Sequence, residues 1–143
     1  MSEILNRDIN EIVELWEIEH EQLQILGRQI IRKYTEGDIE AVRRTLEAFE
    51  LLIKKHFKSE YLTLMEISRH SDALDEMTRE AVATFRESFQ GMQREILKTL
   101  LHYNHRGQDL DEAFFQTFST ILQQLEERVR FEESNLYRLL RQQ

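Results

Sequence analysis

The sequence predicts an all-α protein that folds as an up-down-up-down antiparallel four-helix bundle. Hydrophobic residues recur at steps of three and four in four successive segments, which is the period of a helix with one buried face. Helix breakers are rare, because the 143 residues include 4 Gly and no Pro. Long helices joined by short turns pack most simply as antiparallel neighbours in a single domain, residues 1–143. The helices are expected at residues 4–34, 38–68, 74–103 and 110–140.

The turns between these segments carry the residues that end and begin helices. After the first segment, Gly37 is a typical C-terminal stop and Asp38 a typical N-cap. Ser71 or Asp72 is the expected cap of the third helix. A second glycine-containing turn, with Gly107, precedes the last helix. Each connection is therefore predicted to be short.

Five polar residues fall on the apolar faces of three of these helices. His20 lies on the inner face of the first helix, His56 and Glu60 on that of the second, and Arg128 and Glu132 on that of the fourth. The hydrophobic residues expected inside are Leu5, Ile9, Ile12, Trp16, Leu23, Leu26, Ile30, Ile39, Val42, Leu46, Phe49, Ile53, Leu64, Ile67, Val82, Phe85, Phe89, Met92, Ile96, Leu100, Phe114, Phe118, Ile121, Leu125, Leu136 and Leu139.

A second apolar stripe follows the last helix. It consists of Phe115, Leu122, Val129 and Tyr137. Its simplest interpretation is wide packing against the core, and an interface with a partner or a second copy is the alternative.

The five interior polar residues lie at a comparable depth below one end of the bundle, so they are expected to interact. A buried charge without a partner is costly, and therefore they must pair with one another or bind a ligand. In a closed ion-pair network, Arg128 and one protonated histidine balance the two carboxylates, and no cofactor is needed. In the alternative, His20, His56, Glu60 and Glu132 bind one iron, manganese or zinc ion. The network is favoured, because a guanidinium within the ligand ring would repel a metal.

The overall composition reduces the number of function classes that fit the chain. A formal net charge of −8 disfavours direct binding of nucleic acid and favours a basic protein partner. The chain has no Cys, no signal peptide and no apolar run of membrane-spanning length, so a cytoplasmic location without membrane contact is expected. No phosphate-binding loop or nucleophile with a His–acid pair is present, so the sequence predicts a protein that is not an enzyme. It does not predict whether the chain is a monomer or a homodimer.

The interior polar residues resemble the repeat pattern of hemerythrin-like cation-binding bundles. The resemblance is carried by His20, His56–Glu60 and Glu132–Tyr137. In that family each half of the bundle supplies a His and a His-x-x-x-Glu pair to a non-haem di-iron centre. The resemblance implies a His/Glu site for iron or another divalent metal, with oxygen, redox or storage roles. Arg128 stands where that family has a histidine.

A second resemblance is to the regulator of sigma D family, bacterial anti-sigma factors that are themselves four-helix bundles. It is carried by Asn10–Trp16, His56–Phe57 and Leu125–Glu133, and here Arg128 matches the pattern. This resemblance implies a non-enzymatic binding protein that sequesters the promoter-recognition domain of a primary sigma factor and so regulates transcription. The sequence favours this function and gives the metal-binding one as its alternative, without identifying a partner-binding surface.

Overall fold

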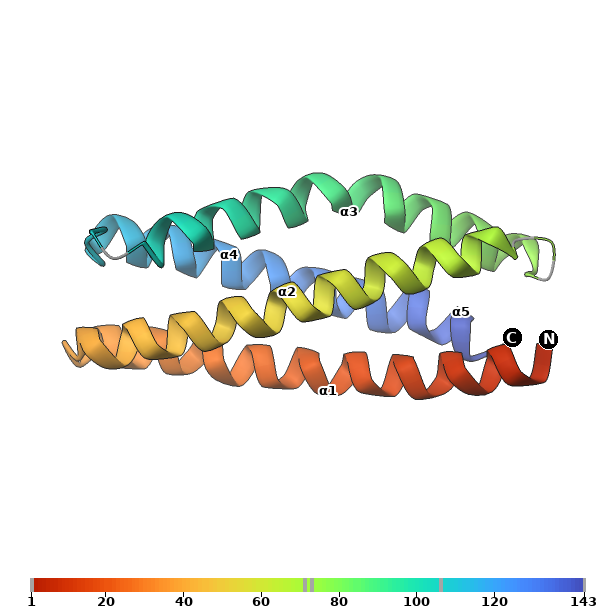
Figure 1. Ribbon diagram of the computed structural model, residues 1–143, viewed down its shortest axis with the longest axis horizontal. Coiled ribbons are helices and arrows are strands. Elements are labelled where there is room, and N and C mark those ends of the chain that lie inside the picture. Colours follow the sequence, from red (N-terminus) through yellow and green to blue (C-terminus); the bar gives the residue numbers. More distant parts are fainter. Residues whose placement is uncertain (1, 71, 73, 106, 143) are drawn as a thin grey trace.

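The computed structural model describes residues 2–70, 72, 74–105 and 107–142, with side chains from Ile9 onward (Figure 1). The expected all-α four-helix bundle is confirmed, with consecutive long helices running in opposite directions and both termini at one end. The helical segments are α1 (Ser2–Thr35), α2 (Ile39–Arg69), α3 (Glu76–Tyr103), α4 (Glu112–Phe131), η2 (Glu132–Tyr137) and α5 (Arg138–Arg141).

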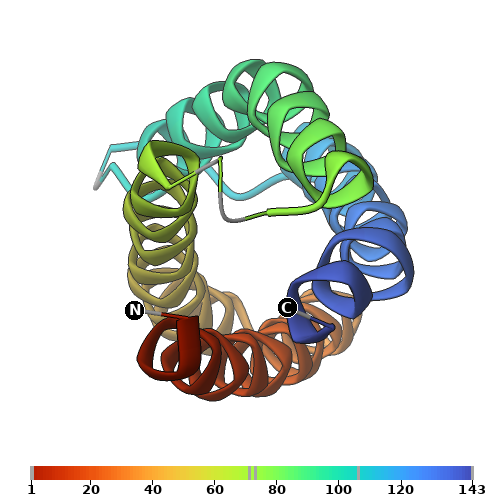
Figure 2. The ribbon, with the colours of Figure 1, turned by 90° about the vertical axis from the view of Figure 1, so that its right-hand side faces the viewer.

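The helices are arranged in a ring when the bundle is viewed from its end (Figure 2). α1 packs against α2 on one side and against α4 and α5 on the other, while α3 packs against α2 and η2. Each long helix thus neighbours those next to it in sequence, as short connections favour. This arrangement brings α1, α2 and the last helix around a common interior.

The first turn is built as the sequence predicted. Gly37 has a φ of 80°, a left-handed conformation that glycine adopts without strain. The N–H of Asp38 reaches back to the carbonyl of Lys33 at 3.0 Å, which ends α1 in a Schellman motif. The Asp38 carboxylate accepts a hydrogen bond from Ala41 N at 3.1 Å and so caps α2.

The predicted cap of α3 was wrong, and the last helix also begins later than expected. Asp75 caps α3 by accepting a hydrogen bond from Thr78 N at 2.7 Å, whereas Asp72 precedes the helix and Ser71 lies outside the described residues. Asp111 caps α4 in the same way, from Phe114 N at 3.1 Å. At both sites a buried leucine directly precedes the aspartate, so the hydrophobic period extends into residues that are not yet helical.

The sequence predicted a regular α-helix to the end of the chain's last helical segment, but the structure departs from this. After α4 the backbone widens into the π-helical turn η2 before a final α-helical turn. The π-turn shifts the inward-facing positions by one residue. As a result Tyr137 is completely buried, together with Leu136.

The predicted hydrophobic seams form the core. Its largest fully buried side chains include Trp16, Tyr137, Phe49 and Phe114. Ile12, Leu26 and Met92 are only partly buried, and Ile39 is exposed because it is the first residue of α2. The side chain of Leu5 lies outside the described residues. No helix in the described ranges combines the length and the apolar character needed to cross a membrane.

The second apolar stripe of the last helix faces α1. Phe115 stacks on Tyr34 with ring centroids 4.8 Å apart, and Leu122 lies directly over Gly27, where a larger side chain would meet it. Val129 and Tyr137 are buried. This stripe is therefore wide core packing within the bundle.

Candidate metal centre

Four polar side chains from three helical segments meet inside the bundle. They are His20 of α1, His56 and Glu60 of α2, and Glu132 of η2, and each is at most 2% exposed. One ligand atom from each lies within 4.8 Å of the others. His56 and Glu60 are one helical turn apart on a common face, and the antiparallel packing of α1 brings His20 opposite them. The structure thus joins the four residues that the sequence proposed as metal ligands.

Carboxylates orient both imidazole rings. His20 Nδ1 lies 3.0 Å from Glu133 Oε2, and His56 Nδ1 lies 2.9 Å from Glu19 Oε1. Because an ionised carboxylate only accepts hydrogen bonds, each Nδ1 carries a proton and each Nε2 is left for another partner. The two Nε2 atoms face each other at 3.0 Å. Two lone pairs repel at this distance, so a proton or a metal cation is required between the rings.

The two buried carboxylates of the cluster complete a ring of donor atoms. Glu132 Oε2 lies 3.5 Å from His20 Nε2 and accepts a hydrogen bond from the Tyr137 hydroxyl at 2.7 Å. Glu60 Oε1 lies 2.5 Å from His56 Nε2 but has no hydrogen-bond partner of suitable geometry among the described residues. A buried acceptor without a donor is costly. Glu60 therefore offers an oxygen to the centre of the cluster.

The charges of the cluster differ from those expected from the sequence, because Glu19 is buried beside it. Glu19 is 2% exposed, and its Oε2 lies 3.9 Å from the ammonium of the largely exposed Lys55. Glu19, Glu60 and Glu132 are three buried carboxylates against the single guanidinium of Arg128. Two further positive charges are needed for neutrality, which either two imidazolium rings or one divalent cation would supply.

The ionisable groups respond to this excess of negative charge. Burial alone would lower the pKa of His56, but the charge of Glu60 and the hydrogen bond to Glu19 raise it to about 10. The pKa of His20 is also raised, because its interactions with Glu132 outweigh burial. Burial and the charge of Glu132 raise the pKa of Glu60 to about 7. Burial would raise the pKa of Glu132 too, but its bond to His20 lowers it. The site therefore attracts positive charge strongly.

Arg128 lies beside the cluster rather than between its ligands. Its guanidinium carbon is 4.4 Å from the ring centroid of Phe85 and 4.3 Å from that of Phe89. It donates hydrogen bonds to Phe85 O at 3.4 Å and to Ser88 Oγ at 3.3 Å. Its Nε lies 3.7 Å from Glu132 Oε1, while Glu132 Oε2 faces the cluster. The guanidinium thus holds one side of Glu132 and leaves the space between the imidazoles free of its charge.

The donor atoms fit one transition-metal ion. Bonds from zinc to imidazole nitrogen and carboxylate oxygen are about 2.0–2.2 Å, so two atoms on one such ion lie about 3.0 to 4.3 Å apart. The 3.0 Å between the two Nε2 atoms already matches two neighbouring ligands, whereas the 2.5 Å between His56 Nε2 and Glu60 Oε1 needs to open by about half an ångström. The widest separation in the cluster, 4.8 Å, needs to close by about half an ångström, which small side-chain rotations provide. Two nitrogens and two oxygens are a donor set suited to iron, manganese and zinc.

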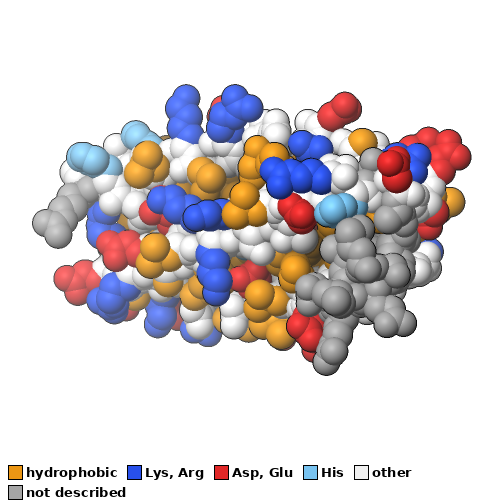
Figure 3. All heavy atoms as spheres, turned by 45° about the vertical axis from the view of Figure 1, so that its right-hand side comes forward, with side chains coloured by type: hydrophobic (Ala, Val, Ile, Leu, Met, Phe, Trp, Pro, Cys, Tyr) orange, Lys and Arg blue, Asp and Glu red, His pale blue; other side chains and the backbone are white. Residues whose placement is uncertain are grey.

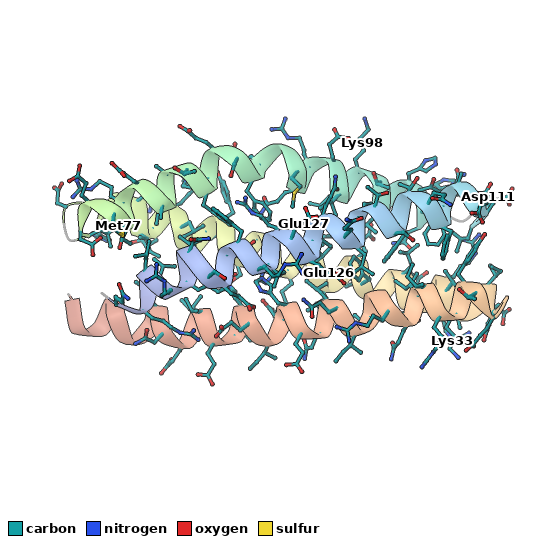
Figure 4. All side chains as sticks on the ribbon, turned by 180° about the vertical axis from the view of Figure 1, so that it is seen from behind. Lys33, Met77, Lys98, Asp111, Glu126 and Glu127 are labelled. Atoms are coloured by element: carbon teal, nitrogen blue, oxygen red, sulfur yellow. The ribbon has the colours of Figure 1, made fainter. Side chains whose placement is uncertain are left out.

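A small cavity connects the cluster to the surface between α1 and α4. Its volume of about 20 Å³ is room for a single water molecule. It is lined by both imidazoles and Glu132 at its inner end and by Gln24 and Glu126, among others, toward the outside. Figure 4 shows Glu126 on the side of α4 that faces α1. The cavity leaves space for a small group directly beside the two imidazoles and Glu132.

Sequence reasoning missed three residues of this site. Glu19 and Glu133 each lie next to a position that was predicted to face inward. The helical period placed their neighbours His20 and Glu132 on the inner faces and did not select these two carboxylates. Tyr137 was assigned to the second apolar stripe and to the segment that resembles hemerythrin-like bundles, but not to the polar cluster, because the π-turn that brings it beside Glu132 has no recognised sequence signal. A carboxylate next to an inward histidine was the one available hint for Glu19, since buried imidazoles commonly donate Nδ1–H to a carboxylate.

The other three histidines lie apart from the cluster. His70 contacts Glu66 at 3.3 Å near the end of α2, and His102 and His105 are exposed at the end of α3 and in the following turn. Residues near the same level of α3, such as Phe89, contribute rings and no ligand atom. The site thus draws its ligands from α1, α2 and η2 alone, within the described residues. No protein-family model, curated protein or solved structure matches the chain significantly.

Proposed function

We propose that the chain binds one transition-metal ion, iron, manganese or zinc, through His20, His56, Glu60 and Glu132. One observation carries this proposal, namely the two Nε2 atoms that face each other at 3.0 Å while a carboxylate holds each ring by Nδ1. Carboxylates that hold metal-binding imidazoles in this way are the usual support of such ligands. A bound iron or manganese ion would supply redox chemistry, and a zinc ion would act as a Lewis acid or stabilise the fold.

The number of ions follows from charge. Three buried carboxylates and one guanidinium leave two negative charges to be balanced, and one divalent ion with neutral imidazoles balances them. A second divalent ion would bring two more positive charges to a neutral cluster. We therefore propose a stoichiometry of one ion per chain.

The first test is metal content together with thermal stability. Metal-free protein is loaded separately with Fe²⁺ (anaerobically), Mn²⁺ or Zn²⁺, desalted, and analysed for its elements. We expect about one ion per chain for at least one metal. At a free-ion concentration of 100 times the dissociation constant, binding adds about 2.7 kcal/mol of stability. For a domain of this size that raises Tm by roughly 8–10 °C, which a chelator would reverse.

Two histidine variants make the comparison specific. His56→Ala removes a proposed ligand and is expected to abolish both the retained metal and the Tm increase. His102→Ala, which removes an exposed histidine at the end of α3, is expected to change neither. Wild-type protein that retains none of the three metals, or a His56→Ala variant that binds as well as wild type, would contradict the proposal.

A second candidate function is sequestration of a protein partner, the promoter-recognition domain of a primary sigma factor. It is favoured by an exposed apolar stripe on α1, formed by Leu15, Ile18 and Ile25, which are 44%, 48% and 46% exposed. On the face that Figure 3 shows, exposed hydrophobic side chains are interspersed with charged ones. The net charge of −8 suits a basic helix-turn-helix domain. As part of this second proposal, the protein would act in the cytoplasm by binding its partner and not as an enzyme.

Calorimetry with the purified sigma-factor domain tests this second function. We expect binding at low salt that weakens as salt screens the charges. The double variant Leu15→Asp/Ile18→Asp should lose most of the affinity, whereas Leu101→Asp, on α3, should keep it. The absence of any heat of binding at low salt at two well-separated temperatures would rule this function out and would leave the metal proposal untouched.

A further inference from the structure

The hydroxyl of Tyr137 lies among the proposed metal ligands. It is 2.7 Å from Glu132 Oε2, 3.2 Å from His20 Nε2 and 3.5 Å from Glu60 Oε2. The side chain is completely buried. A phenol that only stabilised the fold would need one acceptor, whereas this oxygen is within contact distance of three of the four proposed ligands. Its position is that of a fifth donor atom.

The backbone of η2 is what places this oxygen. In a regular α-helix, residues five apart point about 140° away from each other, because each residue turns the helix by about 100°. Glu132 and Tyr137 are five residues apart, and the π-turn brings both to the same side. Single π-turns of this kind occur frequently at functional sites. The irregularity serves the cluster, since it adds Tyr137 without removing Glu132.

The ring is held in this position by its neighbours. It stacks on the His20 ring with an interplanar angle of 16° and centroids 5.6 Å apart. Trp16 packs on it at 5.4 Å and is itself fixed by a hydrogen bond to Ser59. The phenol oxygen is therefore preorganised and does not need to move far to reach an ion among the ligands.

We propose that Tyr137 is the fifth ligand of the site and binds a ferric ion as a phenolate. This inference rests on the proposed function. The donor set would be two imidazole nitrogens, two carboxylate oxygens and one phenolate oxygen, which is rich in the hard oxygen donors that a trivalent ion prefers. On binding, the Tyr137 O–H bond breaks, its oxygen keeps the electron pair, and the proton leaves to solvent.

Charge also selects a trivalent ion once the phenolate is included. The three buried carboxylates and the phenolate carry four negative charges, against one positive charge on Arg128. A ferric ion with two neutral imidazoles makes the cluster neutral. A divalent ion makes it neutral with Tyr137 still protonated, so Fe³⁺ and Zn²⁺ should differ in whether they displace this proton.

The experiment is a titration of metal-free protein with a soluble ferric chelate, followed by desalting. Iron content is measured by elemental analysis and ligation by visible absorption and resonance Raman spectroscopy. We expect a phenolate-to-iron charge-transfer band in the visible region and tyrosinate vibrations enhanced within it. Tyr137→Phe should lose both signals and still bind Zn²⁺. Tyr34→Phe, which removes a tyrosine that stacks on Phe115 instead, should keep both signals.

The outcomes separate this inference from the proposed function. Retained iron without the charge-transfer band, or a band that survives in Tyr137→Phe, would overturn the phenolate ligand and leave the metal site standing. Failure of wild-type protein to retain iron, manganese or zinc would overturn both. If Tyr137→Phe does not fold, as judged by circular dichroism, the tyrosinate vibrations of the wild-type protein decide the question, and their absence counts against the ligand.

Discussion

Two single hydrogen bonds decide whether the imidazoles can act as ligands. Glu19 and Glu133 each fix the tautomer of one ring by accepting from Nδ1, which leaves Nε2 for the centre of the cluster. Glu133 is partly exposed, while Glu19 is buried and has no alternative position in solvent. Of the two supporting carboxylates, Glu19 should therefore matter more for metal affinity.

Glu19→Gln should weaken metal binding by roughly 10- to 100-fold, the usual effect of removing a carboxylate behind a metal-binding imidazole. The amide still fills the space, but it lacks the charge that strengthens the His56 ring as a donor. Competition with a chromophoric zinc chelator measures the change. Glu21→Gln, an exposed residue of the same helix, is the matched control and should bind as wild type does. Equal affinities for both variants would show that Glu19 has no part in the site.

At the scale of the elements, the ends of the helices depend on a few backbone positions. Gly37 requires a positive φ to end α1, whereas Gly91 lies inside α3 with no atom near the place of a Cβ. An alanine at position 37 would be strained, because it does not readily adopt a positive φ. An alanine at position 91 would be favourable, since alanine loses less conformational entropy than glycine in a helix.

Gly91→Ala should therefore raise the free energy of unfolding by about 0.5–1 kcal/mol, and Gly37→Ala should lower it by about 1 kcal/mol. Urea denaturation of the two variants measures both values. Because neither residue contacts the cluster, the metal content should be unchanged in both. Two changes of the same sign would mean that the turn or the helix is built differently from the structure described above.

At the scale of the whole molecule, the cluster couples folding to pH. The pKa of His56 rises from 6.5 to about 10 on folding, so the folded chain holds this proton more tightly than the unfolded chain. The resulting stability is fully present below pH 6.5 and is lost as the pH rises through about 10. Glu60 also makes the folded chain less stable as the pH rises, but at lower pH, because folding raises its pKa from 4.5 to about 7.

The metal-free chain should therefore become less stable as the pH is raised from about 6 to about 10, as urea denaturation at successive pH values would show. Zinc affinity should change in the opposite direction over the range in which zinc stays soluble, because a metal must displace the proton of His56. His56→Gln should flatten the stability profile. A wild-type stability that rises with pH over this interval would contradict the assignment of a raised pKa to His56.

Much of the architecture was determined by the sequence alone. The hydrophobic period, the scarcity of glycine and proline, and the turn at Gly37 and Asp38 are local properties, and they predicted four antiparallel helices with His20, His56, Glu60 and Glu132 pointing inward. Helix periodicity could do this because a side chain's direction depends only on its position along its own helix.

Only the tertiary structure decided how these residues meet. The burial of Glu19, the hydrogen bond from His20 to Glu133 and the stacking of Arg128 on Phe85 and Phe89 each depend on the rotation and height of one helix against another. The π-turn depends on the packing of the last helix as a whole. Local periodicity contains none of this information, since it specifies which face of a helix is buried but not what lies opposite.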